Sequence, residues 1–252
     1  TNVGGTNEAF ALAADLRAGR FDHVSSVAVA GDSAGEFTEE MFDEGQGLPS
    51  AYHRTKFEAE RLVREQSEVP WRVDRPAVVA GGSQTGEMDR VDGPYYFMPM
   101  IKGLRDLLPS WLPLAAAGLG RTNIVPVDFV ARAMNELAHQ PGLDGRAFHL
   151  VNPTPQSNLD VVNALAAAAG APQIVLSVDN ATTDRVTDAV LGSIVGRIVE
   201  SGPGHLIAQQ TVGRLGVPPD VHAHLNLPTT FDATATTNAL VGTDLEVQIG
   251  RA

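Results

Sequence analysis

The sequence predicts an α/β protein: the C-terminal part of a Rossmann-like, doubly wound parallel sheet together with a mostly helical lobe. Short, β-branched segments at 23–30 and 71–80 are bounded by glycines, which is typical of buried strands. An amphipathic segment that opens at Tyr52 lies between them, and a connection of that length favours parallel pairing in a βαβ unit. Beyond Pro153 the strand pattern gives way to Ala-rich helical periodicity.

Composition limits the classes of function. The chain has 252 residues and 43% of them are apolar, so it can bury a sizeable core. Its net charge of −12 argues against a nucleic-acid-binding surface and against general attraction to anionic membranes. The lack of cysteine excludes disulfides, thiolate metal sites and cysteine nucleophiles, and it fits a cytoplasmic protein. We find no signal peptide and no apolar run of about 18 residues, so we predict no membrane span.

The chain is expected to begin with a helix and a strand. Residues 7–20 carry apolar positions at helical spacing, and Gly19 is expected to end this helix. We expect 23–30 to be one buried strand. The acidic, glycine-punctuated stretch 32–47 is expected to be a solvated loop rather than a metal site. It leads into the helix that opens at Tyr52.

The middle of the chain returns to the sheet. Segment 71–80 is the second expected strand. Residues 83–120, rich in Gly, Pro and aromatic side chains, are expected to be irregular and either to line a substrate channel or to form a small packed lobe. A short strand at 121–127 then leads into a helix that Asp128 is expected to cap, and 147–152 is the next strand.

The last third of the chain is expected to be helical. Its last twenty residues are weakly patterned and are expected to fray. We therefore divide the chain into an α/β domain at 1–152, which includes the loops at 83–120, and a mostly helical substrate lobe at 153–252. The expected helices are 158–169, ended by Gly170, then 183–200, 206–215 and 221–227.

Tyr52 and Lys56 are the candidate catalytic pair. Four residues apart on a helix, they lie on one face and can point into one site. A tyrosine phenol has an ordinary pKa near ~10, and a nearby ammonium lowers that pKa towards the range useful for general acid–base catalysis. A serine at the end of the adjacent strand, Ser25 or Ser26, can hydrogen-bond the same substrate oxygen. This set of side chains indicates a protein that acts on a carbonyl group.

Other kinds of site are not supported by the sequence. The histidines show no ligand spacing, and the nearest pattern, His222-x-His224, has no acidic partner, so we predict no metal site. A hydrolase would need a Gly-x-Ser-x-Gly elbow, and the sequence contains none.

Taken in order, the motifs resemble those of the extended short-chain dehydrogenase/reductases. Within that superfamily the chain is most similar to the fatty acyl-CoA reductase and thioester-reductase-like branch, the male-sterility-type NAD-binding domains. The His-Val-Ser-Ser strand and the proline-rich 107–119 segment suggest this branch. Sugar-nucleotide epimerases and dehydratases, and hydroxysteroid-type dehydrogenases, are the alternative. The matching motifs are Asn2-Val3-x-Gly5-Thr6, His23 to Gly31, Tyr52-x-x-x-Lys56 with Glu60, Arg75-Pro76 through Gly81, and Asn123 to Ala131.

The resemblance implies an NAD(P)-dependent oxidoreductase that reduces an acyl thioester or another small carbonyl compound. Tyr52 would donate the proton, and Lys56 would lower the pKa of that tyrosine. Ser26 would orient the carbonyl, with Ser25 as the alternative. Asn2 corresponds to the position that supports the lysine through water.

The resemblance also implies which residues hold the cofactor, NAD or NADP, with NADPH slightly favoured. Lys56 would bind the nicotinamide ribose, and the strand that follows Arg75 would back the nicotinamide ring. The residues implied are Ser25, Tyr52, Lys56, Pro76, Ala77 and Val79.

The sequence departs from the family in one respect. The Gly-x-x-Gly-x-x-Gly turn that holds the cofactor pyrophosphate does not occur, and the glycines at 81–86 have another spacing and follow a late strand. We therefore expect the first strands of the sheet to lie upstream of Thr1, and this polypeptide alone to bind NAD(P) poorly and to be inactive. A non-catalytic dinucleotide-sensing module is a further alternative, although a binding module has no need for Tyr52 and Lys56. The oligomeric state is left open, a homodimer included.

Overall fold

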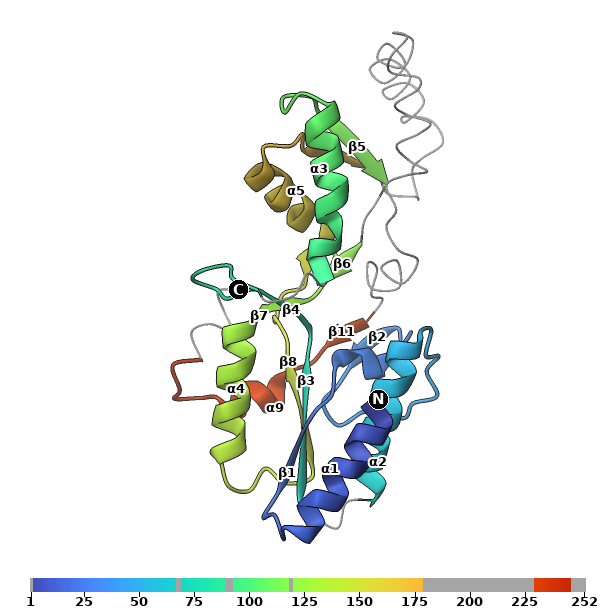
Figure 1. Ribbon diagram of the computed structural model, residues 1–252, viewed down its shortest axis with the longest axis vertical. Helices are drawn as coiled ribbons and strands as arrows, with labels where there is room; N and C mark the ends of the chain where they lie inside the picture. The colour runs from blue at the N-terminus through green and yellow to red at the C-terminus, as the bar shows by residue number, and fades with distance from the viewer. Residues whose placement is uncertain (1, 67–68, 89–92, 118–119, 179–228, 246–252) are drawn as a thin grey trace. The chain divides into compact units, whose positions relative to one another are not determined.

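The computed structural model describes residues 2–66, 69–88, 93–117, 120–178 and 229–245 (Figure 1). The chain forms two compact units whose segments interleave along the sequence. Unit 1 consists of 1–90, 122–155 and 227–252, and unit 2 consists of 91–121 and 156–226. The sequence led us to expect a single boundary, between a domain at 1–152 and a lobe at 153–252, whereas the chain passes between the two units several times.

A three-stranded parallel sheet lies at the centre of unit 1. Strands β1 (Phe21–Val24), β3 (Trp71–Pro76) and β8 (Arg146–Leu150) run parallel in the order β1-β3-β8. The register sets His23 opposite Val73, and Arg75 opposite His149. Helix α2 (Ala51–Gln66) connects β1 to β3, so the predicted parallel strand–helix–strand unit is confirmed.

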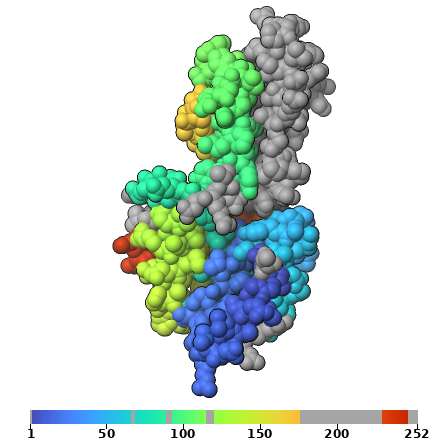
Figure 2. Space-filling view, viewed as in Figure 1, coloured from blue at the N-terminus to red at the C-terminus, as the bar shows by residue number. Residues whose placement is uncertain are grey.

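Helices cover both faces of this sheet. Helix α1 (Asn2–Asp15) packs beside α2 on one face, and α4 (Val127–His139) lies on the other (Figure 1). Side chains alternate along β3: Val73 packs with Val63 of α2, whereas the Arg72 guanidinium donates to carbonyl oxygens at the end of α4. Helix α1, dark blue in Figure 2, lies at the surface and leaves Leu12 58% exposed. The predicted α/β class is therefore confirmed.

The C-terminal segment completes unit 1. Strand β11 (Thr229–Phe231) pairs in parallel with β2 (Gly35–Phe37), and α9 (Thr234–Ala239) follows it. Leu240 and Leu245 are fully buried in the core cluster that contains Phe129 of α4 and Phe148 of β8. The expected fraying is therefore wrong for residues 233–245, because burial of these two side chains holds the segment in place. The expected helices at 183–200, 206–215 and 221–227, and His222 and His224, lie outside the described residues.

Two expected segments near the N-terminus differ in the structure. Residues 27–30 form a 3-10 helix, η1 (Val27–Ala30), and not the continuation of β1. An apolar run by itself does not distinguish a strand from a short buried helical turn. The acidic stretch 32–47 contains β2 and buries Phe37 and Glu39, so the solvated-loop expectation is wrong for these residues.

Short strands extend unit 1 beyond the main sheet. Strand β4 (Val78–Ala80) pairs in parallel with β7 (Ile124–Pro126), which leads directly into α4. Pro126, and not Asp128, is the residue before α4, so the predicted cap is wrong. The Asp128 carboxylate instead accepts hydrogen bonds from the backbone N–H and the hydroxyl of Ser83, each 2.7 Å long.

Unit 2 contains helix and strand where an irregular segment was expected at 83–120. Pro99 falls in the first turn of helix α3, which spans Met98–Leu107, where proline does not break a helix, and this explains the missed helix. The predicted helix at 158–169 is confirmed as α5, with Gly170 in the left-handed conformation after it. Strands β6 (Arg121–Thr122) and β9 (Gln156–Ser157) lie where the chain passes between the units. The described residues of unit 2 also form η2 (Gly93–Phe97), α3 (Met98–Leu107), β5 (Leu114–Ala117), α5 (Asn158–Ala169) and β10 (Ile174–Val178). Strand β10 pairs in parallel with β5.

Within the part of the chain that the structure describes, no helix is long and apolar enough to cross a bilayer. No group of three or more histidine, aspartate or glutamate side chains there could hold a metal ion.

Strand β3 carries an acidic side chain into the core. Asp74 is 3% exposed and is paired with Val24 in the register of β1 and β3. Burial, with a contribution from the negative charge of Asp22, raises the pKa of Asp74 to about 7. The folded protein therefore holds this proton at pH values where the unfolded chain has lost it.

We expect Gly31→Ala to lower the free energy of unfolding by roughly 2–4 kcal/mol. Gly31 has a φ of 57°, and a Cβ there would collide with the carbonyl oxygen of Gly47. Gly45→Ala is the matched control, because Gly45 has a φ of 80° but open space around it, so the cost should be about 1 kcal/mol. Urea denaturation measures both, and equal losses would contradict the steric argument.

We expect Asp74→Asn to stabilise the protein more at high pH than at low pH. Because the folded pKa of Asp74 is raised, wild-type stability falls as the pH rises from about 4 to about 7, and asparagine removes this loss. The gain at pH 8 should exceed the gain at pH 5 by roughly 2–3 kcal/mol. Thermal unfolding at both pH values tests this, with surface Asp106→Asn as the control, and an equal gain at both would refute it.

Candidate active site

Lys56 of α2 places its ammonium at the carboxyl end of β1. Its ammonium donates to the carbonyl oxygens of Val24 (3.1 Å) and Ser25 (3.3 Å). An ammonium has three N–H donors, so one more can reach a ligand. Burial lowers the pKa of Lys56, and the nearby Glu60 carboxylate opposes that shift. The strand end therefore anchors a charged amine where parallel sheets bind their ligands.

Tyr52 lies one turn before Lys56 on the same face of α2 and is 44% exposed. Its ring meets that of His53 edge-on, with 6.2 Å between the centroids. The buried His53 is in turn 2.7 Å from the Ser50 hydroxyl through its Nδ1 atom. Helix α2 packs against η1, which begins directly after Ser26. The elements that carry the tyrosine, the lysine and the serines therefore adjoin.

The two serines have different partners. Ser25 Oγ donates to Glu60 Oε2 at 2.6 Å, and Ser25 is 2% exposed. Ser26 caps η1 by accepting a hydrogen bond from the Ala28 N–H at 3.2 Å, which uses a lone pair of its oxygen. The Ser26 O–H can therefore still donate to a ligand, whereas the Ser25 hydroxyl is committed to a buried carboxylate.

Asn2 contacts the candidate catalytic helix beside the lysine. Its amide donates to Thr55 Oγ1 at 3.2 Å, and the Thr55 hydroxyl donates to the Tyr52 carbonyl oxygen at 3.1 Å. Asn2 therefore joins the start of α1 to α2 at Thr55, the residue that directly precedes Lys56.

Pro76, Ala77 and Val79 lie at and just beyond the end of β3. The Ala77 N–H donates to the Leu150 carbonyl oxygen at 3.0 Å. Ala77 is buried, Val79 is partly buried, and both pack in one cluster with Val27 of η1. Val27 directly follows Ser26 in the chain, so this apolar cluster adjoins the candidate serine.

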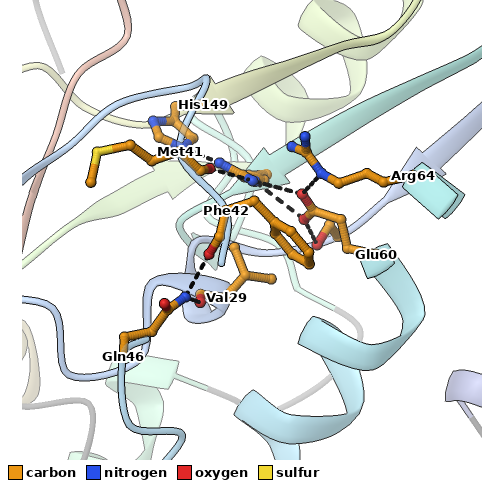
Figure 3. Close-up of polar contacts among 9 residues, drawn as sticks. Val29, Met41, Phe42, Gln46, Glu60, Arg64 and His149 are labelled. Carbon is orange, nitrogen blue, oxygen red and sulfur yellow. Dashed lines mark hydrogen bonds and ion pairs between the residues drawn. The ribbon is translucent and has the colours of Figure 1, made fainter. Parts of the chain in front are cut away.

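A buried ionic network supports this end of the sheet (Figure 3). Arg75 binds Glu60 through Nε and Nη2, with a closest distance of 2.6 Å, and both side chains are fully buried. Arg64 Nε reaches the same carboxylate at 2.9 Å. Burial favours a higher pKa for Glu60, but Arg75, Arg64 and the hydrogen bonds outweigh it and hold the pKa below its ordinary value. The carboxylate is therefore ionised.

The second side of Arg75 faces β8 and the loop after β2. Nη2 donates to the Met41 carbonyl oxygen at 2.9 Å, and Nη1 lies 3.1 Å from His149 Nε2. A guanidinium only donates, so His149 Nε2 is the acceptor and Nδ1–H donates to the Asp232 carbonyl oxygen at 2.6 Å. Burial and the charge of Arg75 lower the pKa of His149 to about 3, so this imidazole is neutral.

The loop that supplies the Met41 carbonyl is itself held by side-chain bonds. The Gln46 amide donates to the carbonyl oxygens of Val29 and Phe42, both at 2.7 Å (Figure 3). Phe42 also stacks on Phe57 of α2, with 4.5 Å between the ring centroids. The loop therefore covers the network as a fixed part of unit 1.

This network was not anticipated from the sequence, in which Glu60 and Arg75 stood out only as parts of motifs and His149 only as one residue of a strand. The signal that could have found them is the presence of Arg72, Asp74 and Arg75 in a strand that is otherwise suited to burial. Buried charges require partners, so such a strand predicts charged groups opposite it.

The parallel sheet with helices on both faces, and a Tyr-x-x-x-Lys helix at its carboxyl edge, define an NAD-binding α/β domain of the short-chain dehydrogenase type. The chain belongs to the male sterility protein family of NAD-binding domains, whose profile matches residues 1–134. The resemblance drawn from the motifs is therefore confirmed.

Two relatives are much longer proteins. Glycine betaine reductase ATRR of Emericella nidulans is 32% identical over 173 residues, which are 65% of this chain and 13% of that protein. Nonribosomal peptide synthetase asaC of Aspergillus flavus is 31% identical over 179 residues, which are 64% of this chain and 16% of that protein. The chain thus spans a small part of the length of the curated relatives it matches.

Solved structures show the same fold. The terminal R domain from the myxalamid PKS-NRPS biosynthetic pathway is 25% identical with a TM-score of 0.65, and the match covers 97% of this chain and 58% of that one. The UDP-glucuronic acid 4-epimerase from Bacillus cereus, in complex with NAD, is 19% identical with a TM-score of 0.54, and the match covers 71% and 56% of the two chains. The second likeness concerns the fold alone.

Proposed function

We propose that this chain acts in the NAD(P)-dependent reduction of an acyl thioester or a related carbonyl compound, with Tyr52 as the proton donor. The observation that carries the proposal is the anchored Lys56 ammonium, bound to the Val24 and Ser25 carbonyl oxygens on the helix face that also holds Tyr52. The likeness to a terminal R domain and to a protein named as a reductase supports reductive chemistry.

The residues of the site suit each step of such a reduction. Reduced NAD(P), when bound, supplies a hydride. Once the thioester carbonyl carbon has accepted it, the carbonyl oxygen carries a negative charge, which the Ser26 O–H can stabilise by donating a hydrogen bond. Tyr52 gives its proton to that oxygen, and Lys56 stabilises the phenolate that remains. The C–S bond of the resulting hemithioacetal then breaks and the hydroxyl proton passes to the departing sulfur, which releases a thiol and an aldehyde.

The residues present fit the nicotinamide half of the cofactor. The Lys56 ammonium spends two of its three N–H bonds on the end of β1, so the third suits a ribose hydroxyl. Val79, which is only partly buried, offers an apolar side chain against which a flat ring can pack, with Ala77 in the core beside it. A comparison of turnover with NADH and with NADPH decides which of the two is used.

We expect Tyr52→Phe to lower the rate of thioester reduction by roughly 10²–10⁴-fold while the affinity for the cofactor stays unchanged, because only the proton donor is lost. The assay follows NADH or NADPH absorbance with octanoyl-coenzyme A as substrate, and cofactor fluorescence gives the dissociation constants. The cofactor that supports faster turnover is assigned as the natural one.

Glu58→Gln is the control variant, because Glu58 pairs with Arg61 on the exposed side of the same helix. It should leave rate and affinity unchanged. A Tyr52→Phe variant that keeps the full rate of thioester reduction would contradict the proposal. Turnover of a nucleotide sugar instead would support the epimerase alternative.

A further inference from the structure

Ser25 is fixed from three directions. Its backbone N–H donates to the Asp74 carbonyl oxygen of β3 at 2.8 Å. Its hydroxyl donates to Glu60 at 2.6 Å, and its own carbonyl oxygen accepts from Lys56 at 3.3 Å. Ser26 is the next residue along the chain, so its direction depends on how Ser25 is held.

The group that holds the Ser25 hydroxyl is itself unable to move freely. Glu60 is fully buried, and its two oxygens accept from Ser25, from Arg64 and from two nitrogens of Arg75. Arg75 is also fully buried and is bound on its far side by the Met41 carbonyl oxygen and by His149. Displacing the carboxylate would break several charge-assisted bonds at once.

A buried ion pair is a poor way to gain stability, because well-packed apolar side chains of similar volume often serve as well or better. What such a pair provides is a defined arrangement, because each charged group accepts few geometries. Here Glu60 follows Lys56 by one helical turn and Tyr52 by two, so the pair fixes α2 against the end of β1 along the face that holds the site.

We propose that Glu60 and Arg75 are positioning residues of this site: they hold Ser25, and through it they set the direction of the Ser26 hydroxyl and the seat of the Lys56 ammonium. The catalytic meaning of this arrangement rests on the proposed function. The arrangement itself is measurable without turnover.

The test is Ser25→Ala in the full chain, read by nuclear magnetic resonance with lysine labelled at Cε with carbon-13. The chain has two lysines, Lys56 and Lys102, and Lys56→Arg assigns their signals. Ser25→Ala removes no charge, so a change in the titration midpoint of Lys56 reports that its ammonium has moved to a different environment. We expect that midpoint to rise by about half a pH unit or more, because an amine released from its buried seat regains water.

A second readout concerns the turn that Ser26 caps. The Ala28 amide, which donates to Ser26 Oγ, should exchange its hydrogen roughly 10-fold faster in Ser25→Ala. Arg75→Lys keeps the charge but loses the forked bond to Glu60, so it should change both readouts in the same direction and serves if the first variant does not fold. Glu58→Gln, on the exposed side of α2, should change neither.

The outcomes separate this inference from the proposed function. Wild-type values for the Lys56 midpoint and the Ala28 exchange in Ser25→Ala would overturn the positioning role, whatever the activity. If the wild-type chain reduces thioesters, Ser25→Ala should lower kcat about 10-fold and also raise the KM for cofactor, because the displaced Lys56 ammonium is the group proposed to bind the ribose. An unchanged kcat and pH profile in that variant would also overturn it. A Tyr52→Phe variant with full activity would refute the proposed function and leave the resonance readouts to decide the positioning role.

Discussion

The ion pair between Glu60 and Arg75 is the interaction on which the arrangement of unit 1 depends. It joins α2 to β3, and its remaining bonds reach the end of β1 at Ser25, the loop at Met41 and strand β8 at His149. Because both charges are buried, replacing Glu60 by an apolar residue would leave the Arg75 guanidinium without its carboxylate, at a cost of about 3–5 kcal/mol. Sheet, helix and covering loop are thus held together by one set of charged contacts.

The same burial decides which charges surround the candidate catalytic pair. Burial lowers the pKa of His23 to about 4 and that of His149 to about 3, so neither imidazole is charged near pH 7. The groups that remain charged at the end of β1 are the Lys56 ammonium and the Glu60 carboxylate with its arginines. The Lys56 ammonium, which donates to two carbonyl oxygens, is therefore a cation on the same face of α2 as Tyr52.

Unit 1 is assembled from three separate stretches of chain, and the last of them helps to hold the other two together. Strand β11 returns to pair with β2, and Phe231 packs edge-on against His149, with 5.6 Å between the ring centroids. Glu39 accepts hydrogen bonds from the backbone of both β8 and α9. The C-terminal segment consequently shares the network that supports the site, although residues 179–228, which lie outside the described structure, separate it from β10.

Local patterns in the sequence were enough to predict the α/β class, the parallel strand–helix–strand unit, helix α5 and the common face of Tyr52 and Lys56. Each of these follows from a periodicity or a spacing within a few residues. The tertiary structure alone decided that Ser25 is committed to Glu60, that Asp128 binds Ser83 instead of capping α4, and that the C-terminal segment is buried. These features depend on contacts between residues far apart in the chain, and no local spacing records which distant group will lie beneath a given side chain.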